Sequence, residues 1–126
     1  MTQRNIIIPT KTVDEGNSCV VDFDLEDPSG NAVANTEVST ALMTIYNFYD
    51  GSTIMEATSV ASGFDANGNF SWTVSGEYNE MVATANSMNM PYEDHIANIV
   101  INFTSDTVSH TLKKNIRIRV NNLRFI

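Results

Sequence analysis

The residues that could do chemistry in this chain are few: two histidines, His95 and His110, and a single cysteine, Cys19. A hydrolase or transferase needs a nucleophile, a base and a charge stabiliser that converge in one pocket. Both histidines lie in apolar strand patterns, without a nucleophile motif or a glycine-rich phosphate loop. A structural role in a sheet therefore fits them better than catalysis. The alternative is a small enzyme that uses His95 with Glu93 or Asp94, two carboxylates that we interpret as solvated loop charge.

Metal binding is also disfavoured by the spacing of the possible ligands. Two histidines and one cysteine that lie far apart do not make the closely paired, four-ligand pattern of a zinc site. Asp65, Asn67 and Asn69 offer oxygen atoms at alternate positions, but Gly68 is misplaced for a calcium loop and no glutamate follows at the required distance. Asn-Gly between aromatic strand residues is instead typical of a hairpin turn. We expect no catalytic residue, no cofactor and no metal ion.

Charge is segregated along the chain, which favours assembly and recognition over bond-making chemistry. The seven basic residues lie at positions 4–11 and 113–124, and the fifteen acidic residues lie between positions 14 and 106. The net charge of −8 argues against nucleic-acid binding, because phosphate neutralisation needs clustered lysine and arginine. No apolar run approaches the ~18 residues of a membrane span. The short run at 6–8 does not make a signal peptide, and one unpaired cysteine fits a protein made in a reducing cytoplasm.

Most of the chain alternates apolar and polar residues, as strands with one buried face do. The pattern covers residues 18–26, 38–49, 53–60, 70–75, 95–103 and 107–120, with turns such as 27–31 and 50–51 between them. Turns spaced by roughly ten residues predict an all-β fold, an antiparallel, immunoglobulin-like β-sandwich of about seven or eight strands. Residues 77–90 are ambiguous between a short helix and a loop. The whole chain, 1–126, is expected to form one domain with an N-terminal arm at about 1–13 and a C-terminal tail at about 121–126.

Side-chain alternation also predicts which residues face the core. Trp72 is expected to anchor it, because its area dominates the core of a small sandwich. The last strand is expected to turn Val108, His110, Leu112, Ile116, Ile118 and Val120 inward. On the outside, an early acidic strand would complement a basic last strand, which predicts ion pairs of Asp22, Asp24 and Glu26 with Arg117 and Arg119.

Exposed aromatic residues are the remaining functional signal. The cluster at 46–49 points to both faces of its strand, so part of it should emerge from the core. Exposed aromatics of this kind mark protein contacts more often than glycan sites. The candidate interface residues are Tyr46, Phe48, Tyr49, Arg117, Arg119, Arg124, Phe125 and Ile126.

Several stretches together resemble the small immunoglobulin-like virion proteins of tailed bacteriophages. These are the Ile6-Ile7-Ile8 start, the run Glu26-Asp27-Pro28-Ser29-Gly30-Asn31-Ala32-Val33, the hairpin Phe64-Asp65-x-x-Gly68-x-Phe70-x-Trp72, and the terminal strand Asn115-Ile116-Arg117-Ile118-Arg119-Val120. The resemblance implies a capsid decoration or cement subunit, or a head or tail accessory module, that binds other virion proteins and has no catalytic site. It also implies that the terminal arm and tail dock onto partners; the alternative for the apolar tail is that it forms the last edge of the domain's own core.

From these observations we expect a non-enzymatic virion structural protein that stabilises a phage head by protein–protein contacts. The expected partners are other virion proteins, the major capsid protein first, together with further copies of the same chain; nucleic acid and membrane are not expected. Two alternatives stay open: a tail or baseplate accessory protein, and a carbohydrate-binding module that stacks a glycan on Tyr46, Tyr49 and Trp72.

Overall fold

The computed structural model describes residues 10–82 and 90–123. These residues form seven strands and three short 3-10 helices, η1 (Asn35–Glu37), η2 (Ala61–Gly63) and η3 (Gly76–Tyr78). The strands are β1 (Thr10–Asp14), β2 (Cys19–Asp24), β3 (Val38–Asn47), β4 (Thr53–Ser59), β5 (Asn69–Val74), β6 (Tyr92–Ser105) and β7 (Val108–Asn121).

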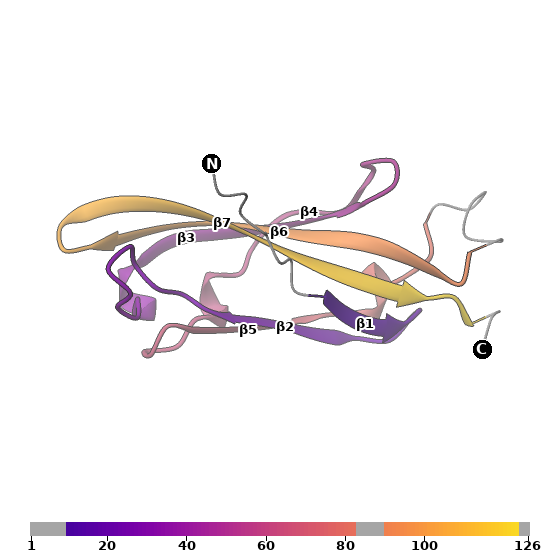
Figure 1. The fold of residues 1–126 in the computed structure, drawn as a ribbon, viewed down its shortest axis with the longest axis horizontal. Helices are drawn as coiled ribbons and strands as arrows, with labels where there is room; N and C mark the ends of the chain where they lie inside the picture. The colour runs from indigo at the N-terminus through magenta and orange to yellow at the C-terminus, as the bar shows by residue number, and fades with distance from the viewer. Residues whose placement is uncertain (1–9, 83–89, 124–126) are drawn as a thin grey trace, which may run out of the picture.

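The strands build two layers, as Figure 1 shows. One layer is a five-stranded sheet in the order β1-β7-β6-β3-β4, and the other is the antiparallel pair β2-β5. The expected all-β sandwich is therefore confirmed. The larger sheet is mixed, because β1 pairs with β7 in parallel while its other neighbours pair antiparallel. The immunoglobulin-like subtype stays a prediction.

The core lies between the two layers and is made by alternate residues of the strands. Ile99 and Ile101 of β6 and Ile116 of β7 are fully buried. From the opposite layer, Val21 and Phe70 are buried as well. Each such side chain contributes about 1.5–3 kcal/mol by leaving water, so this alternation is what holds the sandwich together. Trp72 packs against this core while remaining half-buried.

The inward set predicted for the last strand is wrong at one end. Val108 is 53% exposed, while Ile116, Ile118 and Val120 are fully buried. Val108 is the first residue of β7 and lies opposite Ser105 at the tip of the long β6–β7 hairpin. The tip reaches past the smaller layer, so its alternation has no second sheet to face.

Parts of the segments assigned to the N-terminal arm and the C-terminal tail belong to the sheet or pack against it. Residues 10–13, which we placed in an N-terminal arm, form most of β1 and pair with residues 117–120 of β7. Asn121, placed in the tail, ends β7, and the buried Asn122 donates its backbone N–H to the Pro91 carbonyl at 2.8 Å. Residues 1–9 and 124–126, the remaining parts of the arm and the tail, lie outside the described residues. The stretch 77–90, which was ambiguous between a helix and a loop, begins within η3, and its residues 83–89 also lie outside the described residues. No helix within 10–82 and 90–123 has the length and hydropathy needed to cross a membrane.

Candidate functional site

On the outer surface of the five-stranded sheet, side chains of neighbouring strands lie in rows across the strands. β6 lies between β3 and β7, so Leu42, Val100 and Lys113 form one row, and Tyr46, Ile96 and Arg117 form another. Among the described residues, β2 and β5 cover only the other side of this sheet (Figure 1). We call this surface the outer sheet face; it comprises Thr40, Leu42, Thr44, Tyr46, Phe48, Asp94, Ile96, Asn98, Val100, Asn102, Thr111, Lys113, Asn115, Arg117 and Arg119.

At the end of this face near the hairpin tip, amide and hydroxyl side chains bond to one another. The Asn102 side-chain amide donates to Thr40 Oγ1 at 2.8 Å, and Thr111 Oγ1 donates to Asn102 Oδ1 at 2.6 Å. Further along, the Asn98 amide donates to Asn115 Oδ1 at 2.7 Å. These bonds run across strands, so they hold the polar side chains at this end of the outer sheet face in fixed rotamers.

At the other end, two arginines share one carboxylate. Arg119 donates from Nε and Nη2 to the two oxygens of Asp94, at 3.0 and 3.2 Å. Its guanidinium carbon also lies 3.8 Å from the centre of the Tyr92 ring, a cation–π contact. The hydrogen bond to Asp94 raises the pKa of Arg119 above its ordinary value. Arg119 is thus held in one orientation by a carboxylate and a ring.

Arg117 lies beside this pair in a different environment. Its Nε is 3.9 Å from Asp94 Oδ2, and its guanidinium stacks over the Phe48 ring at 5.0 Å. Phe48 is 51% exposed and meets the Tyr49 ring edge-on, with ring centres 6.0 Å apart. Burial and the nearby Asp94 charge raise the pKa of Tyr49. We call Phe48, Tyr92, Asp94, Arg117 and Arg119 the aromatic–arginine cluster.

The structure brings together five of the eight candidate interface residues. Tyr46, Phe48 and Tyr49 come from β3 and the turn after it, and Arg117 and Arg119 come from β7. The other three, Arg124, Phe125 and Ile126, lie outside the described residues. The sequence named Tyr92 as one of several aromatics that could form a contact surface, but Asp94 was taken for loop charge because the strand was predicted to begin at His95. The available signal was that Asp94 falls in phase with Ile96, Asn98 and Val100.

The predicted pairing of an acidic early strand with the last strand is wrong. Asp22 lies 3.1 Å from Lys11 Nζ, whereas Arg117 and Arg119 face Asp94. The reason is topological, because β2 belongs to the smaller layer and the neighbour of β7 is β6. The arginines of β7 pair with Asp94 because it lies on the neighbouring strand of the same sheet, and opposite charge on a segment of the other layer is not sufficient.

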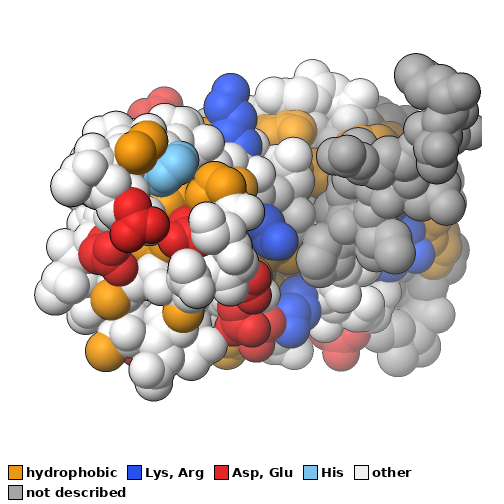
Figure 2. Space-filling model, turned by 60° about the vertical axis from the view of Figure 1, so that its left-hand side comes forward, with side chains coloured by type: hydrophobic (Ala, Val, Ile, Leu, Met, Phe, Trp, Pro, Cys, Tyr) orange, Lys and Arg blue, Asp and Glu red, His pale blue; other side chains and the backbone are white. Residues whose placement is uncertain are grey.

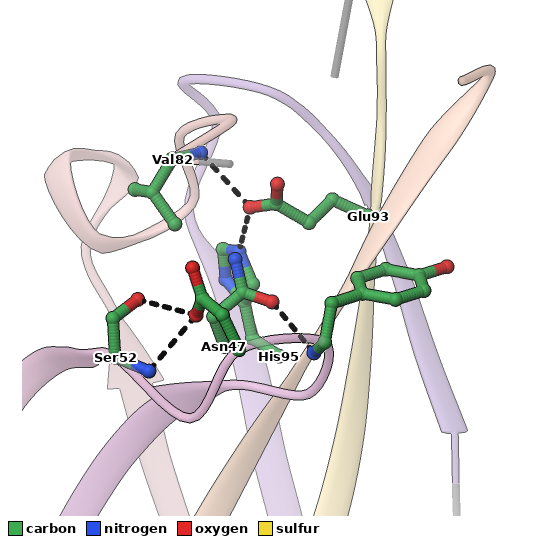
Figure 3. A network of polar contacts seen from close by, with 7 residues as sticks. Asn47, Ser52, Val82, Glu93 and His95 are labelled. Atoms are coloured by element: carbon green, nitrogen blue, oxygen red, sulfur yellow. Dashed lines mark hydrogen bonds and ion pairs between the residues drawn. The ribbon is translucent and has the colours of Figure 1, made fainter. Parts of the chain in front are cut away.

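Glu93 and His95 are buried, so the interpretation of Glu93 and Asp94 as solvated loop charge is wrong. Glu93 is 2% and Asp94 4% exposed, since both lie within β6. The His95 imidazole is fully buried, with Nε2 2.7 Å from Glu93 Oε1, which also accepts the Val82 N–H at 2.9 Å (Figure 3). Asn47, the β3 partner of His95, is fully buried too. Chemistry at His95 would require this part of the fold to open.

The second histidine lies at the opposite end of the molecule, where Figure 2 shows acidic side chains close to a histidine. His110 stacks on Phe103 with ring centres 5.1 Å apart. Next to it, Asp27 accepts a hydrogen bond from Ser105 Oγ at 2.7 Å and from the backbone N–H of Ser29 and Asn31 at 2.9 Å. The serine therefore faces the carboxylate and not the imidazole, which is unlike a nucleophile–base pair.

Asp65 shapes a turn, as predicted. Its Oδ1 accepts the backbone N–H groups of Asn67 and Asn69 at 2.8 and 2.9 Å. These bonds lower the pKa of Asp65. Among the described residues, no three histidine, cysteine, aspartate or glutamate side chains gather as a metal site would require.

The three aromatics proposed for glycan stacking do not share a surface. Tyr46 and Tyr49 belong to the larger layer, while Trp72 lies on β5 opposite the buried Val21 and packs against the core. A glycan could therefore stack only on the aromatics of the outer sheet face.

Comparison with known proteins finds similarity only among solved structures. No protein-family model matches the sequence, and neither does any curated protein. Among solved structures, the chain is similar to the "N-terminal domain of phage TP901-1 ORF48", with a TM-score of 0.45 and 11% sequence identity. The similarity covers 97% of this chain and 89% of that one.

Proposed function

We propose that this chain is a non-enzymatic structural subunit of a bacteriophage virion that binds a partner protein through its outer sheet face. One observation carries the proposal: this face leaves large apolar side chains in water beside arginines that are already held in place. On this face Leu42 is 44% and Phe48 51% exposed, and Tyr49, in the turn that follows β3, is 42% exposed. Aromatic residues and arginine are the types that dominate protein–protein contacts.

Several side chains of the outer sheet face are already held in one orientation, which supports binding by a rigid surface. Arg119 is fixed by Asp94 and Tyr92, and Arg117 lies on the Phe48 ring. Side chains that are already ordered lose less conformational freedom when a partner binds, so more of the contact energy appears as affinity. The cross-strand bonds of Asn98 and Asn102 extend the same order along the face.

Within this class we place the protein as a capsid decoration or cement subunit, located in the virion, with the major capsid protein as its first partner. The support is the resemblance of the sequence to small immunoglobulin-like virion proteins, which spans most of the chain. A tail or baseplate accessory role uses the same face and differs only in the protein bound. A glycan ligand is the remaining alternative.

The test compares two apolar residues of similar exposure, Phe48 and Val108. Val108 is 53% exposed at the hairpin tip, away from the outer sheet face. Phage particles are purified from cells that supply either Phe48→Ala or Val108→Ala, and the amount of each variant per capsid protein is measured. Truncating a central contact residue costs about 2 kcal/mol or more, so we expect roughly thirtyfold less Phe48→Ala in the particle. Equal amounts of both variants would contradict the proposal, and binding of the wild type on a glycan array that Phe48→Ala abolishes would favour the glycan alternative.

A further inference from the structure

The two layers of the sandwich turn clusters of opposite charge to the solvent. On β3, β6 and β7 the outer sheet face carries three cations, Lys113, Arg117 and Arg119, and one anion, Asp94, a sum of +2 within a protein whose net charge is −8. The edge strands β1 and β4 add Asp14 and Glu56 at the margins of this cluster. The outer surface of the β2–β5 layer carries exposed Asp22 and Asp24. The two surfaces face away from each other across the core (Figure 1).

The acidic surface is hollowed where its charges lie. A hollow of about 410 Å³ is lined by Asp22, Phe23, Asp24, Asn69, Phe70 and Ser71. Asp22 already meets Lys11, but no ion pair of Asp24 is found within residues 10–82 and 90–123. On the same surface Val20 is 45% exposed, close to the 44% of Leu42 on the outer sheet face. We call Val20, Asp22, Asp24, Asn69, Ser71 and Thr73 the acidic face.

We propose that the acidic face of one copy of this chain binds the outer sheet face of a second copy. Lys113 and Arg117 of one copy lie against Asp22 and Asp24 of the next, and each surface adds one exposed apolar residue, Leu42 or Val20. Complementary charge of this kind sets the orientation of a contact and excludes like-charged surfaces.

Such a contact joins two different surfaces, so it is heterologous. A pair of copies keeps one free outer sheet face and one free acidic face, so association then either closes into a ring or continues as a stack. A sheet surface can make such a contact, because sheets stack face to face at a spacing of about 10 Å. This inference rests on the proposed function in using the same outer sheet face, and it names a second copy as the occupant.

The experiment uses the purified chain alone and two charge-reversal variants. One variant is Lys113→Glu with Arg117→Glu, and the other is Asp22→Lys with Asp24→Lys. Sedimentation velocity is measured over a range of protein concentrations at about 10 mM and about 150 mM salt, where the screening lengths are about 30 Å and about 8 Å. We expect the wild type to associate, and to do so more strongly at the lower salt concentration. For each variant alone we expect an association constant that is lower by roughly tenfold or more.

Mixing the two variants is the decisive step. The first variant has two acidic surfaces and the second has two basic ones, so a head-to-tail contact predicts that the mixture associates although neither variant does so alone. A double reversal at exposed positions elsewhere, Glu77→Lys with Glu80→Lys, changes the net charge as much as the acidic-face variant and should leave association as in the wild type. Because Arg117→Glu places a second carboxylate near Asp94, Lys113→Glu alone is measured as well, and thermal unfolding verifies that each variant is folded.

Three results would overturn the inference: a wild type that stays monomeric at all concentrations, a mixture that forms no complex, or an acidic-face variant that associates as the wild type does. The last result would indicate a symmetric contact between two outer sheet faces. None of these results bears on the particle experiment with Phe48→Ala, so the proposed function and this inference can fail separately.

Discussion

Asp94 and Arg119 lie directly opposite each other on β6 and β7, and the arginine donates two hydrogen bonds to the carboxylate. Asp94 is almost fully buried, whereas the Arg119 side chain is 35% exposed. At this end of the sheet the arginine therefore covers the Asp94 carboxylate and presents a fixed cation to the solvent. Arg117, 3.9 Å from the same carboxylate, depends on Asp94 as well.

Removing Arg119 should destabilise the fold more than its exposure suggests. Arg119→Ala leaves the buried Asp94 with Arg117 as its remaining cation, and a charged group that loses a hydrogen-bond partner costs about 1–3 kcal/mol. Chemical denaturation measures the free energy of unfolding. Lys113→Ala, on the same face, is the control and should change it by less than about 0.5 kcal/mol. Equal effects of the two substitutions would show that the Asp94 pair contributes nothing.

The Asp27 carboxylate should make stability depend on pH at the hairpin end. The hydrogen bond from Ser105, together with those from the backbone of Asn31 and Ser29, lowers the pKa of Asp27 below its ordinary 3.8. The folded-state pKa is thus below the unfolded one, so the stabilisation is complete above pH ~3.8 and is lost as the pH falls through the folded value. Asp27→Asn should lower the unfolding temperature at pH 7, and the difference from wild type should shrink below pH ~3.8. A difference that stays constant from pH 7 to pH 2 would refute this assignment.

His95 should matter for folding more than His110. His95→Ala removes a fully buried ring and one hydrogen-bond partner of Glu93, which should cost about 2–4 kcal/mol. His110 is only partly buried on Phe103, so His110→Ala should cost less than about 1 kcal/mol. Denaturant unfolding of the two variants gives the comparison. A small loss at His95 with a large loss at His110 would reverse the structural roles assigned to them.

The turn at the tip of the long hairpin should tolerate, and gain from, glycine. Asp106 and Thr107 both have positive φ, 51° and 65°, a conformation that costs a residue with a side chain about 1–2 kcal/mol. Thr107→Gly should therefore raise the free energy of unfolding by about 1 kcal/mol. The contrasting variant is Gly68→Ala at φ +81°, where a Cβ atom would meet the Leu25 carbonyl oxygen at 2.8 Å, and it should destabilise. Unfolding midpoints that fall for both variants would show that the Thr107 side chain stabilises the turn.

Much of the local structure could be predicted from the sequence because strand alternation is a local property. The alternation from Cys19 to Leu25 predicted which side chains face the core, and the turn at Asp65 was read from residue types alone. The alternation did not predict at which residue of a strand the side chains begin or cease to be buried. Glu93 and Asp94 are polar in sequence yet buried, since β6 extends to Tyr92 alongside β7, beyond the end of β3. Val108 is apolar yet exposed, because its position lies beyond the second layer.

By itself, the sequence determined the class of fold, the positions of most strands and turns, and the separation of charge along the chain. The tertiary structure decided which charges meet: Asp94 with Arg119, 25 residues apart, and Lys11 with Asp22 across the two layers. It also decided that β1 runs parallel to β7, which joins the two ends of the described chain. The physical reason is that strand pairing is chosen by the burial of whole faces between distant segments, and no local pattern of residues records which segments those are.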